Sequence, residues 1–559
     1  MYCSHNKPQA LSRPRKCVAQ ILAQMLTLLL ALHPAATAAQ QPDSSPAAVA
    51  QTWHISGKVV DARSGQALAR CVVEIDPTDN RGQSLSVETG DDGRFDFAGL
   101  RLGKYELNAA KRGYLTQSYQ EHEGFSTAIA VGPELKSEDL IFNLPPQGIF
   151  YGTVSDETGE PIRRAQVHLY EDRDVDGIRS THQRQTFITD DRGMYEIPNI
   201  APGNYFLSVS AQPWYGAVMS GVRSPMRSND GQPLLDSALD VAYPTIFYPD
   251  AIDSDDAVPI PIRGGERIVA NMTLTAQRAM HLHVALARGQ EEGHVSIEQT
   301  VFGQLEPMPM IMETSNAGGV EISGVLPGRY EVTVSHSEGQ SPPESTHFTA
   351  DIADGATQVS AEGGVGDVSV SGKVTSVGKI RSASISLVSS HPQRNYTVPV
   401  NDAGEFTMQV VPGEYQVMGQ IPQMYVAGVS SPNAEVKGRL LQVKAGDAPR
   451  LEIVAGTGYG KIEGLAERAG HPTSGVMILL APEDAKDNQI LFRRDQSDSD
   501  GTFLLFDIIP GRYRLLAIEE GWDLNWADPN VLAAYLKKSI TVQVRAHDKL
   551  KQMVEVQSR

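Results

Sequence analysis

Short runs in which apolar and polar residues alternate follow one another along most of the chain, and Gly, Pro, Asp and Asn separate them. Alternation with a period of two predicts β-strands that bury one face. One stretch occurs five times: an acidic or Asn-containing turn with Gly, an apolar strand, and a Gly-x-Tyr that opens the next strand. The copies are DDGRFDFAGLRLGKY, DDRGMYEIPNIAPGNY, NAGGVEISGVLPGRY, NDAGEFTMQVVPGEY and DSDGTFLLFDIIPGRY. The recurrence predicts five units of one fold.

The Gly-x-Tyr of each copy predicts a corner between two strands. In four copies Pro directly precedes the Gly, which is the pairing of a type II turn, because Pro presets its own φ and Gly takes a positive φ without steric cost. The Tyr is predicted to be structural, with its ring in the core and its hydroxyl bonded to upstream backbone, as in the tyrosine corner of immunoglobulin-like sandwiches. The five residues are Tyr105, Tyr205, Tyr330, Tyr415 and Tyr513.

The units also share an opening pair of strands and a closing pair, which together give about seven short strands each. The predicted fold class is all-β: a tandem array of about five seven-stranded immunoglobulin-like or prealbumin-like β-sandwiches. With 559 residues the chain is too long for one core, and about 100 residues per unit is an ordinary domain size. The predicted units are 52–145, 146–278, a divergent 279–363, 364–457 and 458–559.

The N-terminus has the order of a secretory signal peptide: basic residues, an apolar run, and then small residues in HPAATAAQQ. We therefore predict a signal peptide at 1–39, a linker at 40–51, and a mature chain without a membrane span; an uncleaved N-terminal anchor is the alternative. The expected location is secreted, periplasmic or on the outer cell surface. Cys71 is then the one remaining thiol, and its place in ARCVVEI predicts a small buried hydrophobe.

The net charge of -19 is spread along the chain rather than gathered in a tail. It repels phosphate backbones, and no basic patch with interleaved aromatic residues accompanies it, so nucleic acid is not an expected partner.

Two insertions interrupt the repeats. The second unit carries a long loop at 214–256, and loops of such length are often functional. In the fifth unit DLNWADPNVLAAYLKK predicts a short helix near 528–538, with Asp528 as its N-cap and Pro529 in its first turn.

The pattern G-x-V-x-D-x-x-G-x-P-I-x-x-A-x-V-x-L at residues 152–169, followed by D-D-x-G-x-Y and P-G-x-Y, resembles the carboxypeptidase regulatory-like domain. This transthyretin-like sandwich is similar in shape to collagen-adhesin B-type repeats and starch-binding-like domains. The chain as a whole resembles large secreted bacterial proteins built of such domains. The resemblance implies a fold found beside carboxypeptidase catalytic domains and no activity of the fold itself.

Two patterns raise the question of a metal. Asp172, Asp174 and Asp176 alternate before a Gly, as in the first half of an EF-hand loop, and this spacing predicts a calcium site or a solvated hairpin tip. His168 and Glu171 have the spacing of a zinc peptidase motif, but strand geometry places them on opposite faces. No other cofactor and no catalytic residues are expected.

Seven aromatic residues in the insertions are candidate ligand-binding groups, because aromatic faces stack on sugar rings and favour protein interfaces. The alternative is that they pin long loops to their own units. We predict a non-enzymatic binding or spacer module for carbohydrate or a surface protein; the alternatives are a scaffold for an envelope complex or accessory domains of a peptidase or hydrolase system. The candidates are Trp214, Tyr215, Tyr243, Phe247, Tyr248, Trp522 and Trp526.

Overall fold

The computed structural model describes residues 52–79, 81–175, 177–216, 239–285, 294–308, 311–315, 319–336, 344–355, 358–360, 364–380, 382–390 and 393–559. The predicted signal peptide and linker lie outside these residues. Five consecutive stretches of chain each enclose a hydrophobic core of their own, and we number them as the first to fifth sandwich.

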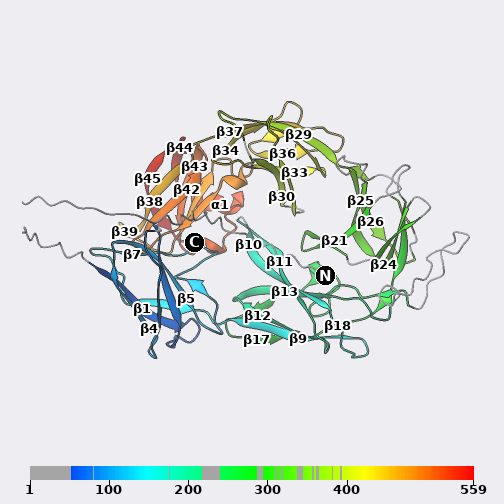
Figure 1. Cartoon of the computed structure of the whole chain (residues 1–559), viewed down its shortest axis with the longest axis horizontal. Helices are drawn as coiled ribbons and strands as arrows, with labels where there is room; N and C mark the ends of the chain where they lie inside the picture. Colours follow the sequence, from blue (N-terminus) through cyan, green and yellow to red (C-terminus); the bar gives the residue numbers. More distant parts are fainter. Residues whose placement is uncertain are drawn as a thin grey trace, which may run out of the picture. The chain divides into compact units, whose positions relative to one another are not determined.

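The first sandwich, drawn at the blue end of Figure 1, consists of β1–β8. One sheet has the order β4-β1-β8, and the other has the order β3-β2-β5-β6, with β7 also paired to β5. Alternate side chains of the two sheets meet in the core, where Cys71 is fully buried, as predicted for a small hydrophobe. The strands are β1 (Trp53–Asp61), β2 (Val72–Pro77), β3 (Leu85–Glu88), β4 (Arg94–Leu100), β5 (Gly103–Ala110), β6 (Gln117–Ser118), β7 (Ile129–Val131) and β8 (Leu140–Leu144).

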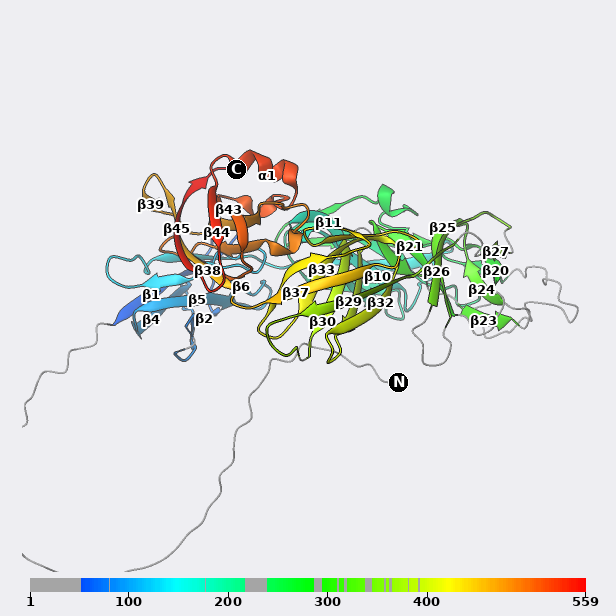
Figure 2. The same ribbon diagram turned by 90° about the horizontal axis from the view of Figure 1, so that it is seen from above.

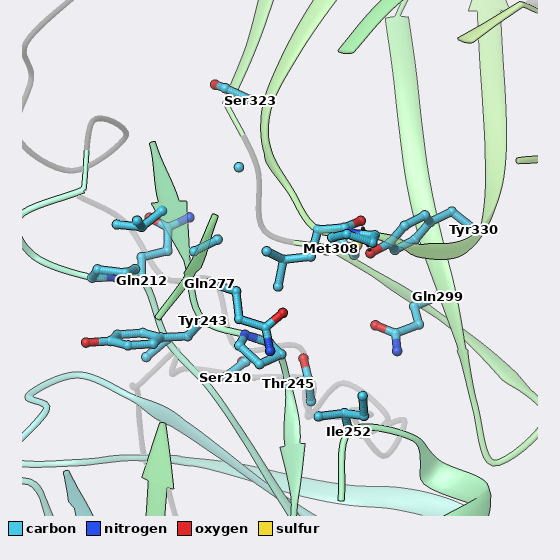
Figure 3. Close-up of a pocket in the computed structure, with 18 residues that line it drawn as sticks. Ser210, Gln212, Tyr243, Thr245, Ile252, Gln277, Gln299, Met308, Ser323 and Tyr330 are labelled. Carbon is cyan, nitrogen blue, oxygen red and sulfur yellow. Dashed lines mark hydrogen bonds between the residues drawn. The ribbon is translucent and has the colours of Figure 1, made fainter. Parts of the chain in front are cut away.

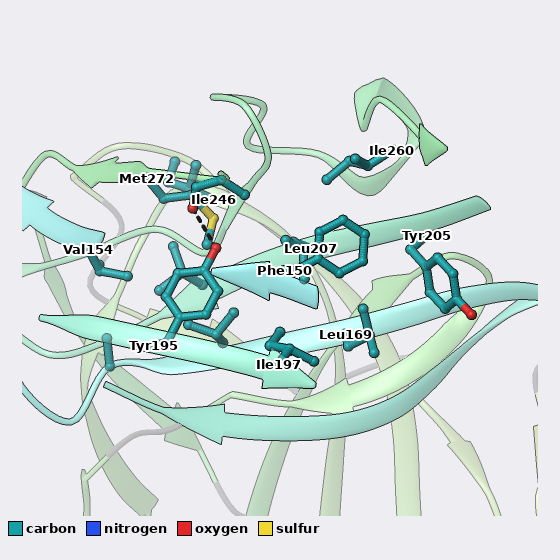
Figure 4. Packing of buried hydrophobic residues seen from close by; sticks show 14 of the residues in the cluster. Phe150, Val154, Leu169, Tyr195, Ile197, Tyr205, Leu207, Ile246, Ile260 and Met272 are labelled. Carbon is teal, nitrogen blue, oxygen red and sulfur yellow. Dashed lines mark hydrogen bonds between the residues drawn. The ribbon is translucent and has the colours of Figure 1, made fainter. Parts of the chain in front are cut away.

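The second sandwich consists of β9–β19, and Figure 4 shows its core. Phe150 and Tyr205 meet edge to face with ring centroids 5.8 Å apart, and the Tyr195 hydroxyl donates to the Ala270 carbonyl. The strands are β9 (Gly148–Asp156), β10 (Gln166–Val175), β11 (Ile178–Ile188), β12 (Met194–Ile200), β13 (Gly203–Ser210), β14 (Val241–Ala242), β15 (Ile246–Phe247), β16 (Ile260–Ile262), β17 (Arg267–Val269), β18 (Met272–Leu274) and β19 (Gln277–Arg278), with a 3-10 turn at Ser254–Asp256.

The third and fourth sandwiches repeat this two-sheet plan. Their sheets are β23-β24-β20-β27 with β22-β21-β25-β26-β28, and β32-β29-β37-β34 with β31-β30-β33-β36-β35. The third has β20 (Met280–Ala285), β21 (His294–Val301), β22 (Gln304–Pro307), β23 (Ile311–Ser315), β24 (Gly319–Val325), β25 (Gly328–His336), β26 (Glu344–Ile352), β27 (Gln358–Ser360) and β28 (Val365–Gly366). The fourth has β29 (Val368–Thr375), β30 (Ser384–Ser390), β31 (Gln393–Pro399), β32 (Glu405–Val410), β33 (Gly413–Gln420), β34 (Tyr425–Ser430), β35 (Glu435–Lys437), β36 (Leu440–Val443) and β37 (Arg450–Gly456).

The fifth sandwich differs because β45 pairs with both β38 and β43 and so makes its two layers continuous. The predicted helix is present as α1 (Pro529–Leu536), which lies against β43 (Figure 2). The Asp528 side chain accepts a bond from the Asn530 N–H at 2.8 Å, which confirms the predicted N-cap. The strands are β38 (Gly460–Arg468), β39 (His471–Pro472), β40 (Met477–Pro482), β41 (Arg493–Gln496), β42 (Thr502–Ile508), β43 (Gly511–Ile518), β44 (Ile540–Val544) and β45 (Lys549–Gln557), with 3-10 turns at Gln489–Leu491 and Gly521–Asp523.

A parallel pairing of the opening strand with a closing strand is common to all five sandwiches. It joins β1 to β8, β9 to β17 and β18, β20 to β27, β29 to β37, and β38 to β45. All other pairings of these opening strands are antiparallel. The opening and closing landmarks in the sequence are therefore neighbours in one sheet.

The five repeated Tyr side chains form the predicted corner. Each ring is buried, and each hydroxyl donates to the carbonyl of the residue four positions upstream, over 2.5–3.1 Å. Such a bond contributes about 0.5–1.5 kcal/mol net, and its loss would leave a buried hydroxyl unsatisfied. The structural interpretation of the Tyr residues is confirmed.

The predicted type II turn is wrong for the four Pro-Gly copies, because their Gly residues do not have a positive φ. A Cβ on any of these four residues would come within 3.1–3.4 Å of the Tyr ring or hydroxyl two residues later. Gly is favoured there because the ring folds back over it and any Cβ would press on the ring. The four residues are Gly203, Gly328, Gly413 and Gly511.

A positive φ occurs four positions upstream of the Gly-x-Tyr Gly in the first, second, third and fifth sandwiches. The residues are Gly99, Asn199, Gly324 and Asp507, with φ between 51° and 83°. In the second and fifth sandwiches the strand register shifts at this point, which is the geometry of a β-bulge. The bulge sets the bend before the corner.

Candidate functional site

The acidic tip of the second sandwich is part of a hairpin, not of a free loop. Asp172 and Asp174 lie in β10, where Asp172 pairs with Thr181 and Asp174 pairs with Arg179 of β11. The Asp172 carboxylate accepts a bond from Arg179 Nε at 3.0 Å, and Asp174 Oδ1 accepts one from the Gly177 N–H at 2.6 Å. Asp176 lies outside the described residues.

These bonds use one carboxylate oxygen of each residue, Asp172 Oδ2 and Asp174 Oδ1. Within the described ranges no group of three or more His, Cys, Asp or Glu residues is arranged to hold a metal ion. The calcium site stays a prediction. His168, the other residue with a metal-like spacing, bonds Thr186 at 3.0 Å and Ser210 at 3.3 Å through its ring nitrogens.

The aromatic residues of the long loop separate into buried and exposed groups. Tyr243 is buried in the core of its own sandwich, and Tyr248 packs against the same core. Phe247 is buried against Val301 and Phe302 of the third sandwich. Trp214 is 73% exposed, and its ring meets Tyr215 edge to face with centroids 5.8 Å apart. Of these candidates, Trp214 therefore has the most open face for a ligand.

Trp522 and Trp526 are both buried, although they flank a surface helix. Trp522 stacks on His122 of the first sandwich, with centroids 5.3 Å apart and the planes 6° from parallel, and Phe125 lies 5.6 Å away on a tilted stack. Trp526 meets Phe492 edge to face at 5.1 Å. Trp522 and Trp526, which were predicted to bind a ligand, therefore pack against other parts of the same chain.

Arg494 contacts both the aromatic rings and an acidic side chain. Its guanidinium lies over the rings of Trp526, Phe125 and Trp522, at 4.4, 5.1 and 5.9 Å from their centroids. The same side chain bonds the Glu123 carboxylate of the first sandwich at 2.5 Å. Cation–π contacts of a desolvated Arg contribute up to about 2 kcal/mol each.

The tip of the β10–β11 hairpin completes this contact from the second sandwich. The Ala527 N–H donates to the Gly177 carbonyl at 2.9 Å, and the Arg179 N–H donates to Asn525 Oδ1 at 2.9 Å. Gly177 has a φ of +85°, and a Cβ there would lie 2.6 Å from the Trp526 ring and from the Ala527 Cβ. This position therefore requires Gly on two grounds.

A second, polar half of the contact connects the first sandwich with the repeated turn of the fifth. Lys104, the middle residue of the first Gly-x-Tyr, bonds Asp498 at 2.5 Å, Asp500 at 3.2 Å and the Thr502 hydroxyl. The Ala128 N–H donates to Asp498 Oδ1 at 3.0 Å. The acidic turn of one repeat thus binds the corner of another.

Backbone and amide bonds continue this polar half. The Ser499 N–H donates to the Ala128 carbonyl at 3.0 Å, and the Ala130 N–H donates to Ser499 Oγ at 2.8 Å. The Gln496 amide donates to the Gln120 carbonyl at 2.7 Å and to Thr127 Oγ1 at 2.8 Å. We call the whole set the junction: Lys104 and residues 120–130, the hairpin tip 177–179, and segments 492–502 and 521–532.

We expect strong coupling between Lys104 and Asp498, because both are more than two-thirds buried. In a double-mutant cycle of Lys104→Met and Asp498→Asn, the coupling energy should be about 0.5–3 kcal/mol. Arg267 and Glu196, 3.2 Å apart and about half exposed, are the control pair, with about 0–1 kcal/mol expected. Equal coupling in both cycles would contradict a buried polar contact.

Asp495 lies within the junction, and its pKa is the most strongly shifted of the carboxyl groups there. Burial raises the pKa of Asp495 to about 6, although the N–H of Leu504 donates to its carboxylate at 2.6 Å. Burial also raises the pKa of Asp498, and Lys104 acts in the opposite direction.

The raised pKa predicts a stability that depends on pH. Between the ordinary Asp pKa of 3.8 and about 6, the folded state holds a proton that the unfolded state has lost, so stability falls as the pH rises through this window. Asp495→Asn removes the cost of ionising a buried carboxyl group. The difference in unfolding free energy between this variant and the natural chain should therefore shift in favour of the variant by about 1–3 kcal/mol from pH 4 to pH 7. Chemical denaturation at both pH values measures the gain, and an equal difference at the two would contradict it.

The third sandwich contains a hydrogen-bonded set of Thr, His and Asp side chains. The sequence did not indicate it, because strand pairing alone brings these residues together. His347 contacts Thr333 Oγ1 at 2.9 Å and Asp367 Oδ1 at 2.8 Å. Nucleophilic catalysis needs such distances but also free N–H donors for an oxyanion. Thr333 lies in mid-strand, with β21 and β26 paired on its two sides, so the ladder uses the neighbouring backbone groups.

A small pocket lies between the second and third sandwiches (Figure 3). Its volume is about 120 Å³, and none of the 18 residues that line it is charged. Ser210, Thr245, Gln277 and Gln299 supply hydroxyl and amide groups, and apolar residues including Met308 fill the rest.

Sequence reasoning missed Lys104, Arg494 and Gln496 as residues of the site. Each looks like an ordinary polar residue of a strand or turn, and its partner lies more than 360 residues away. Nothing local distinguishes them.

Comparison with known proteins identifies two of the sandwiches. Residues 54–131 and 150–228 match the carboxypeptidase regulatory-like domain, so the predicted resemblance is confirmed for the first and second sandwiches. A search of curated proteins finds no significant match.

Solved structures similar to the chain include three pilins. A streptococcal ancillary pilin is 10% identical over 56% of this chain and 98% of its own, with a TM-score of 0.20. A minor pilin of Streptococcus agalactiae is 12% identical over 40% and 96%, with a TM-score of 0.20. The major pilin subunit BcpA of Bacillus cereus is 11% identical over 73% and 99%, with a TM-score of 0.13. Similarities of this size carry no inference about function.

Proposed function

We propose that this array of sandwiches is a non-enzymatic binding and spacer module of the cell envelope or the extracellular space, with carbohydrate as its ligand. The first 39 residues would direct its export as a signal peptide. Among the described residues no helix is long and apolar enough to cross a membrane.

The junction is the observation that carries this proposal. It uses the acidic hairpin tip and the segment around α1, two features that the repeated units do not share, to hold three sandwiches together. Buried contacts with two different sandwiches oppose the domain motions expected of small polar interfaces. Such a frame suits a module that presents a surface at a fixed geometry.

The long loop of the second sandwich is the remaining insertion, and it supports the choice of ligand. It presents Trp214, which is 73% exposed, and the preceding residue, Pro213, lines a pocket whose lining residues carry no charge. An open aromatic face and a pocket with hydroxyl and amide groups are both suited to a neutral sugar.

The test is retention of the full chain on a glycan array and on insoluble peptidoglycan. We expect binding to at least one neutral polysaccharide and weaker binding by Trp214→Ala. No retention on any glycan, together with capture of one defined protein from an envelope fraction, would replace this function by the scaffold. Labelling by a fluorophosphonate that His347→Ala abolishes would replace it by a hydrolase.

A further inference from the structure

The pocket between the second and third sandwiches offers the chemistry for a particular group of a sugar. Resting on the proposed carbohydrate function, we infer that this pocket receives the acetamido group of an N-acetylated amino sugar. Neutrality, size and the division of its lining into polar and apolar groups all support this ligand.

The lining excludes a charged group as the favoured occupant. None of its 18 residues is Asp, Glu, Lys, Arg or His. A carboxylate, phosphate or ammonium placed there would lose its hydration without gaining a counter-charge, which is costly in a partly enclosed site. A neutral group with its own donor and acceptor avoids this cost.

The size of the pocket restricts it to a small group. A volume of about 120 Å³ is below the range of about 300–1,000 Å³ that encloses a whole drug-sized ligand. It is close to the cavity of about 150 Å³ that accepts a benzene molecule. An acetamido group fits this volume, whereas a complete sugar ring must remain at the mouth.

The lining offers partners for each part of an acetamido group. The side-chain amides of Gln277 and Gln299 lie on either side of the space, near the Thr245 hydroxyl (Figure 3). Amides can donate to the acetamido carbonyl and accept from its N–H. Ile252 and Met308 supply apolar surface for its methyl group.

The residue that follows Pro213 offers a partner for the sugar ring. Pro213 lines the pocket, and Trp214 follows it with its face open to solvent. Tyr215 contacts the Trp214 ring edge to face and so holds its orientation. An exposed, supported indole is suited to stacking on a pyranose ring.

Two trisaccharides with the same β1–4 linkage test the inference on the full chain by isothermal titration calorimetry. One is the trimer of N-acetylglucosamine, and the other is the trimer of glucose, which lacks the acetamido groups. We expect the first to bind at least tenfold more tightly. Gln277→Leu and Gln299→Leu should each weaken its binding about three- to tenfold, because each removes hydrogen bonds of ordinary strength.

Gln393→Leu in the fourth sandwich is the matched control, since it removes an exposed amide remote from the pocket in sequence. Gln277 is itself exposed, so its replacement should not disturb folding, and circular dichroism checks both variants. Equal binding of the two trimers would overturn the acetamido site and leave the carbohydrate function intact. Binding of the N-acetylated trimer that neither Gln variant weakens would overturn this pocket as its site. Failure of both trimers, with another glycan retained on the array, would overturn the inference alone; failure of every glycan would overturn the proposed function too.

Discussion

Replacement of Trp526 by alanine is expected to lower the free energy of unfolding of the fifth sandwich by about 3–5 kcal/mol, the usual cost of deleting a buried aromatic ring. The ring is 5% exposed, contacts Phe492 and lies beneath the Arg494 guanidinium. Its loss opens a cavity where the fifth sandwich meets the hairpin tip of the second. The same change should therefore loosen the contact with Gly177.

Hydrogen exchange separates these two effects, because it reports stability at individual segments. Exchange should accelerate at β40 and β43 and also at the hairpin tip 177–179. Trp214→Ala is the matched control, since this ring is 73% exposed and its loss should change stability by no more than about 0.5 kcal/mol. Trp526→Phe should cost less than alanine, because Phe keeps an aromatic ring in place and the buried indole Nε1 has no hydrogen-bond partner among the described residues. Unchanged exchange at the hairpin tip in Trp526→Ala would contradict its contact with the fifth sandwich.

Gly177→Ala is expected to separate the hairpin tip from the fifth sandwich. The new Cβ would lie 2.6 Å from the Trp526 ring and the Ala527 Cβ, so one of the two elements must move. Gly159→Ala is a close control within the same sandwich, because Gly159 has a φ of +87° against +85° and no atom within 4 Å of its Cβ position. Both variants carry the cost of a left-handed Ala, about 1–2 kcal/mol, and only Gly177→Ala carries the clash.

The Ala527 amide gives the readout, since it donates to the Gly177 carbonyl. Its exchange should accelerate at least tenfold in Gly177→Ala and stay unchanged in Gly159→Ala. Equal exchange in the two variants would show that the tip does not pack against Trp526.

The repeated part of the fold could be predicted from the sequence because its causes are local. Alternation predicts the strands, and the recurring Tyr predicts a corner, since a buried hydroxyl needs a partner that the backbone four residues upstream supplies. The turn type could not be predicted in the same way. Pro-Gly favours a type II turn locally, but the Tyr205 ring folds over Gly203 and makes the absence of a Cβ, rather than a positive φ, the requirement.

The candidate site was predictable only as a set of separate segments. The acidic tip and the helical insertion were singled out because they do not repeat, yet nothing local indicated that Gly177 lies against Trp526. Asp498 was equally hidden, because the acidic turn of the fifth copy reads like the others and its partner Lys104 is 394 residues away. Contacts of this kind depend on how folded units pack, which an alternation pattern does not record.

Disulfide formation between Ala130→Cys and Ser499→Cys tests the junction most directly. The Ala130 N–H bonds Ser499 Oγ at 2.8 Å, so the two positions are adjacent although 369 residues separate them. Mild oxidation should close this loop in nearly all molecules and shift their migration under non-reducing denaturing electrophoresis. Ala130→Cys paired with Ser389→Cys of the fourth sandwich is the control. Cross-linking at positions 130 and 499 that is no faster than in the control would contradict the junction.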